Sequence, residues 1–231
     1  MPLIQRGALL QQQQSKAQLS VIIPTRNEPL IQVLVDHVHR AFSYIDHEII
    51  VVDKSDRLPI LKDARVIQQH STGLGRAILE GVAMAQTEWV AVMDGDFSHQ
   101  PRDLALMFAG IGRRDFVLGS RYASGGRNLD IPVRRLASRA FNMIARLILG
   151  LNFSDPMSGL ILAKTTVFQR VRPNPIGFKI NLEVIFRATR LGFRGGEVPI
   201  TFVARSSGRS KAGVREAVRT LSYILALRLR R

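Results

Sequence analysis

Short apolar runs alternate along the first half of the chain with segments of helical period. The apolar runs predict strands at residues 19–23, 48–52, 65–68, 89–93 and 116–119. Between them, apolar residues three and four positions apart predict helices around residues 29–43, 75–86 and 101–110. Strands that alternate with helices are typical of an α/β fold, in which helices cover both faces of a mainly parallel sheet. Ligands of such sheets bind at the carboxyl ends of the strands, where polar residues gather here at 24–28, 53 and 94–98.

The pattern after residue 120 is more basic and less regular. It predicts a basic loop, a helix from about 132 to 150, a turn at 154–159, a helix near 181–191, a strand at 197–203 and a flexible basic loop at 205–211. Residues 1–18 are rich in glutamine and show no period, which predicts a mobile tail. We therefore expect one large domain over residues 19–213, followed by a C-terminal basic amphipathic helix over residues 214–231.

Two of the predicted helices have a polar face and an apolar face. The helix at 132–150 has a polar stripe opposite an apolar face, and the stripe consists of Arg135, Arg139, Asn142 and Arg146. The C-terminal helix has an apolar line formed by Val214, Val218, Leu221 and Leu225. An ordinary charged face in water explains both patterns. The alternative is that the apolar faces lie in a membrane interface, with the arginines at the level of the lipid headgroups.

Charge is distributed unevenly along the 231 residues. Residues 1–115 contain 12 basic and 13 acidic residues, whereas residues 116–231 contain 21 and 5, so the net charge of +15 belongs to the C-terminal half. Such a surface attracts nucleic acid, an anionic membrane or phosphorylated small molecules. No apolar run is long enough to span a bilayer. The absence of cysteine excludes disulfides and a cysteine nucleophile, and it fits a reducing compartment.

Two carboxylates follow the predicted strand at 89–93. Asp94 and Asp96 flank Gly95, and such a pair at a strand end suits a Mg²⁺ or Mn²⁺ ion that also binds substrate phosphates. An acidic pair after a strand often only caps the next helix, but Asp53 and Glu28 at neighbouring strand ends strengthen the metal interpretation. The glycine-rich motifs of dinucleotide-binding and P-loop proteins are absent, which disfavours hydride transfer and P-loop hydrolysis.

Seven segments, in this order, resemble the motifs of family-2 glycosyltransferases with the GT-A (Rossmann-like) fold, and most closely those of the dolichol-phosphate (polyprenol-phosphate) mannose synthases. The segments are LSVIIPTRNE at 19–28, EIIVVD at 48–53, GLGRAILEG at 73–81, VMDGDFSH at 92–99, GSRY at 119–122, DPMSG at 155–159 and GEVPI at 196–200. The resemblance covers about residues 19–213. It implies a mixed, mainly parallel sheet flanked by helices, with C-terminal amphipathic helices.

The resemblance also implies a role for individual residues. The guanosine part of GDP-mannose would be held by Pro24, Arg26, Glu28, Val51 and Asp53. The cofactor, Mg²⁺ or Mn²⁺, and the diphosphate would be bound by the motif that contains Asp94, Gly95, Asp96 and Ser98. Phosphates of the donor would contact Arg121, Arg205 and Lys211, and the lipid phosphate of the acceptor would contact Arg134 and Ser138. Asp94, Asp96 and Arg121 would be the catalytic residues.

The reaction that the resemblance implies is an inverting transfer of mannose from GDP-mannose to dolichyl or polyprenyl phosphate. The segment at 53–57 reads DKSDR, whereas relatives usually read DDGSPDGT, so UDP-glucose or another sugar nucleotide stays open as the donor. We expect a cytoplasmic enzyme that attaches peripherally to the cytoplasmic face of a membrane, directly or through a separate membrane protein. The rival interpretation is a non-catalytic basic domain that binds anionic lipid or nucleic acid. No nucleic-acid partner is expected, because aromatics make up only 6% and are not interleaved with the basic residues.

Overall fold

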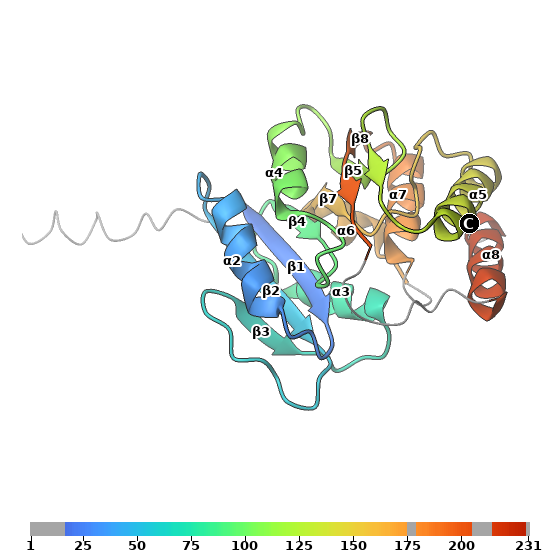
Figure 1. Ribbon diagram of the computed structural model, residues 1–231. Coiled ribbons are helices and arrows are strands. Elements are labelled where there is room, and N and C mark those ends of the chain that lie inside the picture. The colour runs from blue at the N-terminus through green and yellow to red at the C-terminus, as the bar shows by residue number, and fades with distance from the viewer. Residues whose placement is uncertain (1–16, 175–178, 205–213, 230–231) are drawn as a thin grey trace, which may run out of the picture.

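A seven-stranded sheet forms the centre of the molecule (Figure 1). The computed structural model describes residues 17–174, 179–204 and 214–229. The strands lie in the order β3-β2-β1-β4-β7-β5-β8, and only β7 is antiparallel to its neighbours. Their bounds are β1 (Leu19–Thr25), β2 (His47–Asp53), β3 (Arg65–Gln68), β4 (Trp89–Val92), β5 (Phe116–Ser120), β7 (Ile161–Lys164) and β8 (Gly195–Pro199). The short strands β6 (Arg127–Asn128) and β9 (Thr201–Phe202) form a second, two-stranded sheet.

Helices cover both faces of the sheet, as the alternating pattern predicts. The helices are α2 (Ile31–Ala41), α3 (Leu74–Met84), α4 (Pro101–Ala109), α5 (Pro132–Leu149), α6 (Thr165–Val171), α7 (Ile180–Arg190) and α8 (Val214–Leu229). Helices α2 and α4 bury their apolar residues with one face of the sheet, and α3, α5, α6, α7 and α8 do so with the other. The prediction of a mixed, mainly parallel α/β fold is confirmed.

One predicted element differs from the structure, and two elements of the structure were not predicted. The strand predicted at 197–203 is two strands, because residues 195–199 pair with β5 and residues 201–202 pair with β6. Strand β7 and helix α6 were not predicted. Only four residues form β7, and α6 begins at the very next residue without an intervening turn, so the sequence contains no boundary between the two periods.

The polar stripe predicted on α5 is wrong at one position. Asn142 faces inward and is 2% exposed, whereas the apolar residues Leu136 and Leu147 are 72% and 77% exposed. Helix α8 lies beside α5 and also exposes apolar residues, namely Val218, Leu221, Leu225 and Leu229. Both helices therefore present apolar side chains to water. In the described part of the chain, no helix is both long and apolar enough to cross a membrane.

Candidate active site

The carboxyl ends of β1 and β2 are joined by hydrogen bonds to Asp53. The Thr25 hydroxyl donates to the Asp53 carboxylate, and the backbone N–H of Ser55 donates to Asp53 Oδ1 at 2.7 Å. Asn27 N in turn donates to Ser55 Oγ at 2.7 Å. Asp53 is almost fully buried, so its first role is to hold these two loops together. The loops enclose a hollow of about 310 Å³ lined by Asn27, Glu28, Pro29, Asp53, Ser55, Arg57 and Pro59.

The other residues predicted to hold the nucleoside lie around this hollow or in the strands beneath it. Pro24 and Val51 are buried in β1 and β2, Glu28 is half-buried, and Arg26 is exposed at the end of β1. Lys54, the departure from the usual motif, extends toward the end of β3. Its Nζ donates to the carbonyls of Gln69 and Ser71 at 3.1 and 3.2 Å. Lys54 thus fastens the loop that leads into α3.

Asp94 and Asp96 lie on a tight turn directly after β4. A Cβ on Gly95 would lie 2.8 Å from Thr25 Cγ2, so only glycine lets this turn pack against the end of β1. Asp94 is partly exposed, and Asp96 Oδ1 accepts the N–H of Ser98 at 3.1 Å. The structure therefore brings the predicted metal-binding residues Asp94, Asp96 and Ser98 into one turn beside Asp53 and Thr25.

The polar atoms of this turn fit a divalent cation. Ser98 Oγ and His99 Nδ1 are buried and have no hydrogen-bond partner among the described residues. His99 Nδ1 lies 3.5 Å from Asp94 Oδ2, and burial lowers the pKa of His99 although Asp94 opposes the shift. The described residues contain no group of three or more His, Cys, Asp or Glu that could hold a metal. Two carboxylates and a hydroxyl instead match Mg²⁺ or Mn²⁺ sites that substrate phosphates complete.

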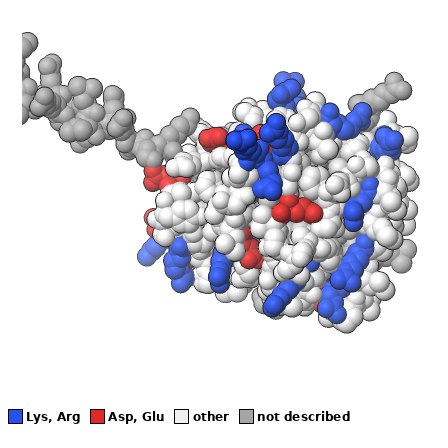
Figure 2. Space-filling model, turned by 90° about the horizontal axis from the view of Figure 1, so that it is seen from above, with Lys and Arg blue, Asp and Glu red and all other residues white. Residues whose placement is uncertain are grey.

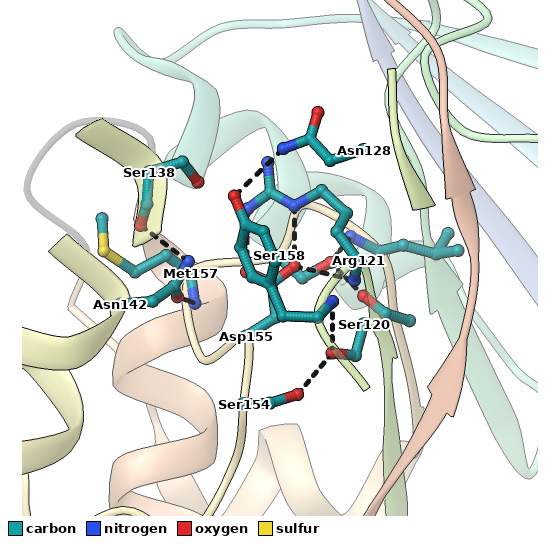
Figure 3. A network of polar contacts seen from close by, with 12 residues as sticks. Ser120, Arg121, Asn128, Ser138, Asn142, Ser154, Asp155, Met157 and Ser158 are labelled. Carbon is teal, nitrogen blue, oxygen red and sulfur yellow. Dashed lines mark hydrogen bonds and ion pairs between the residues drawn. The ribbon is translucent and has the colours of Figure 1, made fainter. Parts of the chain in front are cut away.

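Arg121 follows β5 and is fixed by Asp155 (Figure 3). Its Nε and Nη2 donate to the two carboxylate oxygens at 2.6 and 2.8 Å, and its backbone N donates at 3.0 Å. The guanidinium also lies over the rings of Tyr122 and Phe202, 5.4 and 5.2 Å from their centroids. Burial alone would lower the pKa of Arg121, but the bonds to Asp155 outweigh it and the pKa is raised. Arg121 is a permanent, immobile positive charge.

The turn at 154–159 connects Arg121 with the turn that contains Asp94 and Asp96. Glu197 holds one end, because its carboxylate accepts the N–H groups of Ser154 and Asp155 at 2.8 and 2.9 Å. At the other end Gly159 lies against Asp94, since a Cβ there would be 3.0 Å from Asp94 Oδ2. Residues 155–159 and 196–200 are among the segments that resemble the family motifs, but no role was predicted for Asp155 or Glu197.

The family model described as Glycosyl transferase family 2 matches residues 20–172, about two thirds of the chain. The chain belongs to glycosyltransferase family 2. It is 32% identical over 90% of its length to the dolichol-phosphate mannosyltransferase of Pyrococcus furiosus, and it spans 63% of that protein. It is 33% identical over 86% of its length to the polyprenol monophosphomannose synthase of Mycolicibacterium smegmatis, of which it spans 83%.

Solved structures also share the fold of this glycosyltransferase. Glucosyl-3-phosphoglycerate synthase from Mycobacterium tuberculosis, in complex with Mn²⁺, UDP and phosphoglyceric acid, superposes with a TM-score of 0.68 at 19% identity. The match covers 91% of this chain and 77% of that one. The same enzyme with UDP-glucose gives a TM-score of 0.66 at 20% identity, covering 91% and 80%. The predicted GT-A fold is confirmed.

Lys179 is a further buried charged residue close to Arg121, and no role was predicted for it from the sequence. It lies immediately before α7, and burial together with the nearby Arg121 charge lowers its pKa to about 8. Asp155 and Asp94 oppose that shift, so Lys179 lies in the electrostatic field of Arg121, Asp155 and Asp94. No local pattern could have identified it, because these neighbours come from three distant segments of the chain.

The residues predicted to hold the lipid phosphate lie on α5. Arg134 and Ser138 are one helical turn apart, and the Arg134 guanidinium is 3.4 Å from Asp130. Arg134 is 43% exposed, which leaves it accessible to a ligand, and Ser138 is half-buried. Arg205 and Lys211, predicted to contact the donor phosphates, lie outside the described residues.

Proposed function

We propose that this glycosyltransferase moves mannose from GDP-mannose to polyprenyl phosphate. A phosphate oxygen of the acceptor attacks C1 of mannose from the face opposite GDP. The bond between C1 and the diphosphate oxygen breaks, GDP leaves with the electron pair, and the configuration at C1 inverts. The support from relatives is that this chain is 32% identical to a dolichol-phosphate mannosyltransferase and 33% identical to a polyprenol monophosphomannose synthase.

The geometry that carries the proposal is the fixed Arg121 beside the Asp94 turn. The acceptor oxygen is already an anion, so the enzyme needs no strong base. It must instead bring two anions together and stabilise the departing diphosphate. Arg121 keeps its proton and its place, because two hydrogen bonds from its guanidinium and one from its backbone N–H join it to Asp155. Asp94, Asp96 and Ser98 would hold Mg²⁺ or Mn²⁺, which would supply further positive charge for the diphosphate.

The two substrates would occupy opposite sides of the turn that contains Asp94 and Asp96. The nucleoside would bind in the hollow beside Asp53 and Glu28, over Pro24 and Val51, with the exposed Arg26 at its rim. The turn that contains Gly95 would lie beside the diphosphate, and Arg205 and Lys211 would complete the donor site. The lipid phosphate would bind Arg134 and Ser138 on α5. That placement leaves C1 of the sugar between Arg121 and α5.

The face formed by α5 and α8 would rest on the cytoplasmic surface of a membrane. On α5 the exposed apolar line consists of Leu136, Met143 and Leu147, and α8 exposes a similar line. Figure 2 shows basic side chains along the right-hand side of the molecule, where Figure 1 places these helices. Apolar residues flanked by arginines suit insertion among anionic headgroups. Attachment through a separate membrane protein is the alternative.

Transfer of radiolabelled sugar into lipid tests the proposed reaction. The enzyme is incubated with Mn²⁺, polyprenyl phosphate and, in separate reactions, labelled GDP-mannose, UDP-glucose and other sugar nucleotides, and the organic phase is counted. We expect label from GDP-mannose alone, loss of the signal with EDTA, and recovery with excess Mn²⁺. Preferential use of another nucleotide would show that the donor is wrong. Absence of labelled lipid with every nucleotide would refute the proposed function.

A further inference from the structure

Asn142 is a buried polar residue just past the midpoint of helix α5, and the part of the helix before it is not buried. All residues of α5 are described, and none of residues 132–141 is buried. Asn142 is the first residue of α5 that is buried, and Ala145 and Leu149 follow on the same inward face. The half of α5 that contains Arg134 and Ser138 is therefore not anchored by a buried apolar side chain.

Both ends of the Asn142 amide make hydrogen bonds (Figure 3). Its Oδ1 accepts the backbone N–H of Met157 at 3.0 Å, and its Nδ2 donates to the carbonyl of Ser138 at 3.0 Å. One amide thus connects the turn at 154–159 to the helical turn that begins at Ser138. A second, longer contact supports the same half of the helix, because Tyr122 Oη donates to the Arg135 carbonyl at 3.4 Å.

The turn that Asn142 holds is the one that fixes the catalytic groups. Two residues before Met157, Asp155 binds Arg121, and two residues after it, Gly159 lies against Asp94. The six-residue turn at 154–159 therefore contacts the Arg121 guanidinium, the turn that contains Asp94, and helix α5. The turn itself is held by Ser158, whose hydroxyl donates to the Gly119 carbonyl at 2.6 Å, and by Asn181, whose amide donates to Ser158 and Gly159.

We propose that Asn142 is a positioning residue that fixes the acceptor-binding half of α5 relative to Arg121 and Asp94. This inference rests on the proposed function, in which Arg134 and Ser138 of α5 hold the acceptor phosphate. Asn142 does not touch either substrate. It determines how far the attacking oxygen lies from C1 of the sugar, and a misplacement of about 1 Å in such a reaction costs about a hundredfold in rate.

Two variants separate this role from a general effect on stability. Asn142→Leu keeps the branched shape of the side chain but removes both hydrogen bonds, whereas Asn142→Asp keeps an acceptor for the Met157 N–H. Leu149→Ala is the control, because Leu149 is buried on the same face of α5 and its loss destabilises the helix without touching Asn142. Transfer is measured with the sugar nucleotide that the wild-type enzyme uses, at saturating donor and varied polyprenyl phosphate, and donor affinity is measured by calorimetry.

We expect Asn142→Leu to lower kcat about tenfold to a hundredfold and to leave the donor dissociation constant within about twofold. Asn142→Asp should recover part of kcat, and Leu149→Ala should keep kcat despite a lower melting temperature. Equal kcat in Asn142→Leu and Leu149→Ala, or a parallel loss of donor affinity in Asn142→Leu, would overturn the inference. Use of a donor other than GDP-mannose by the wild type would contradict only the proposed function. No transfer with any donor would overturn both.

Discussion

Replacing Asp155 with asparagine removes the negative partner of a buried ion pair. Asp155 is fully buried and Arg121 is 14% exposed, so the guanidinium would keep its charge where water cannot compensate it. An asparagine side chain offers only one oxygen, and its NH₂ group would face one of the Arg121 donors. Removing one partner of such a pair costs about 3–5 kcal/mol of unfolding free energy. In a chain of this size that corresponds to a decrease in melting temperature of about 6–20 °C.

Urea unfolding, followed by the fluorescence of the single tryptophan, Trp89, measures this loss. Asp130→Asn is the matched control, because Asp130, just before α5, pairs with the exposed Arg134 and such pairs contribute at most about 1 kcal/mol. The double variant Arg121→Met with Asp155→Leu should regain most of the stability, since it leaves no unpaired charge. The reasoning fails if Asp155→Asn costs less than the control, or if the double variant is no more stable than Asp155→Asn.

Three further predictions concern ligand and membrane binding. Arg134→Ala should raise the KM for polyprenyl phosphate about tenfold to a hundredfold, because a charge-assisted contact contributes about 1.5–3 kcal/mol, and leave GDP-mannose affinity unchanged. Arg146→Ala, at the far end of α5, is its control, and equal effects of the two variants would argue against the acceptor site. Lys179→Met should weaken GDP-mannose binding in calorimetry and Lys179→Arg should restore it, whereas no difference between them would exclude an electrostatic role. Binding to anionic liposomes should weaken with salt, since the Debye length is about 8 Å at physiological ionic strength, and should be lost in Leu136→Gln with Leu147→Gln; equal binding to neutral vesicles would contradict this.

The sheet and its helices could be predicted from the sequence because most elements show a regular period and are separated by polar turns. The strand ends were predictable for the same reason, and Asp53, Asp94 and Asp96 do meet at one edge of the sheet. The adjacency of β1, β2 and β4 is a general consequence of parallel strands with helical connections. Whether each predicted site residue contacts substrate stays a prediction.

The contacts between distant segments could not be predicted. Arg121 and Asp155 are 34 positions apart, and Asp155 and Glu197 are 42 apart, so no local pattern relates them. Asn142 was assigned to the polar face of α5 because its spacing matches the neighbouring arginines, yet its inward direction depends on the turn at 154–159. Strand β7, inserted between β4 and β5, brings that turn to the site, and its four residues were too few to be recognised.

Formation of mannosyl lipid by Asp94→Asn, compared with the wild type, tests the central claim most directly. Asn keeps the shape of the side chain and removes the charge of a partly exposed carboxylate, so the melting temperature should change little. With labelled GDP-mannose, polyprenyl phosphate and Mn²⁺, we predict labelled lipid from the wild type and a rate lower by about a hundredfold or more from the variant. A variant whose rate in Mn²⁺ matches that of the wild type, or a wild type that keeps its rate in EDTA, would contradict the account.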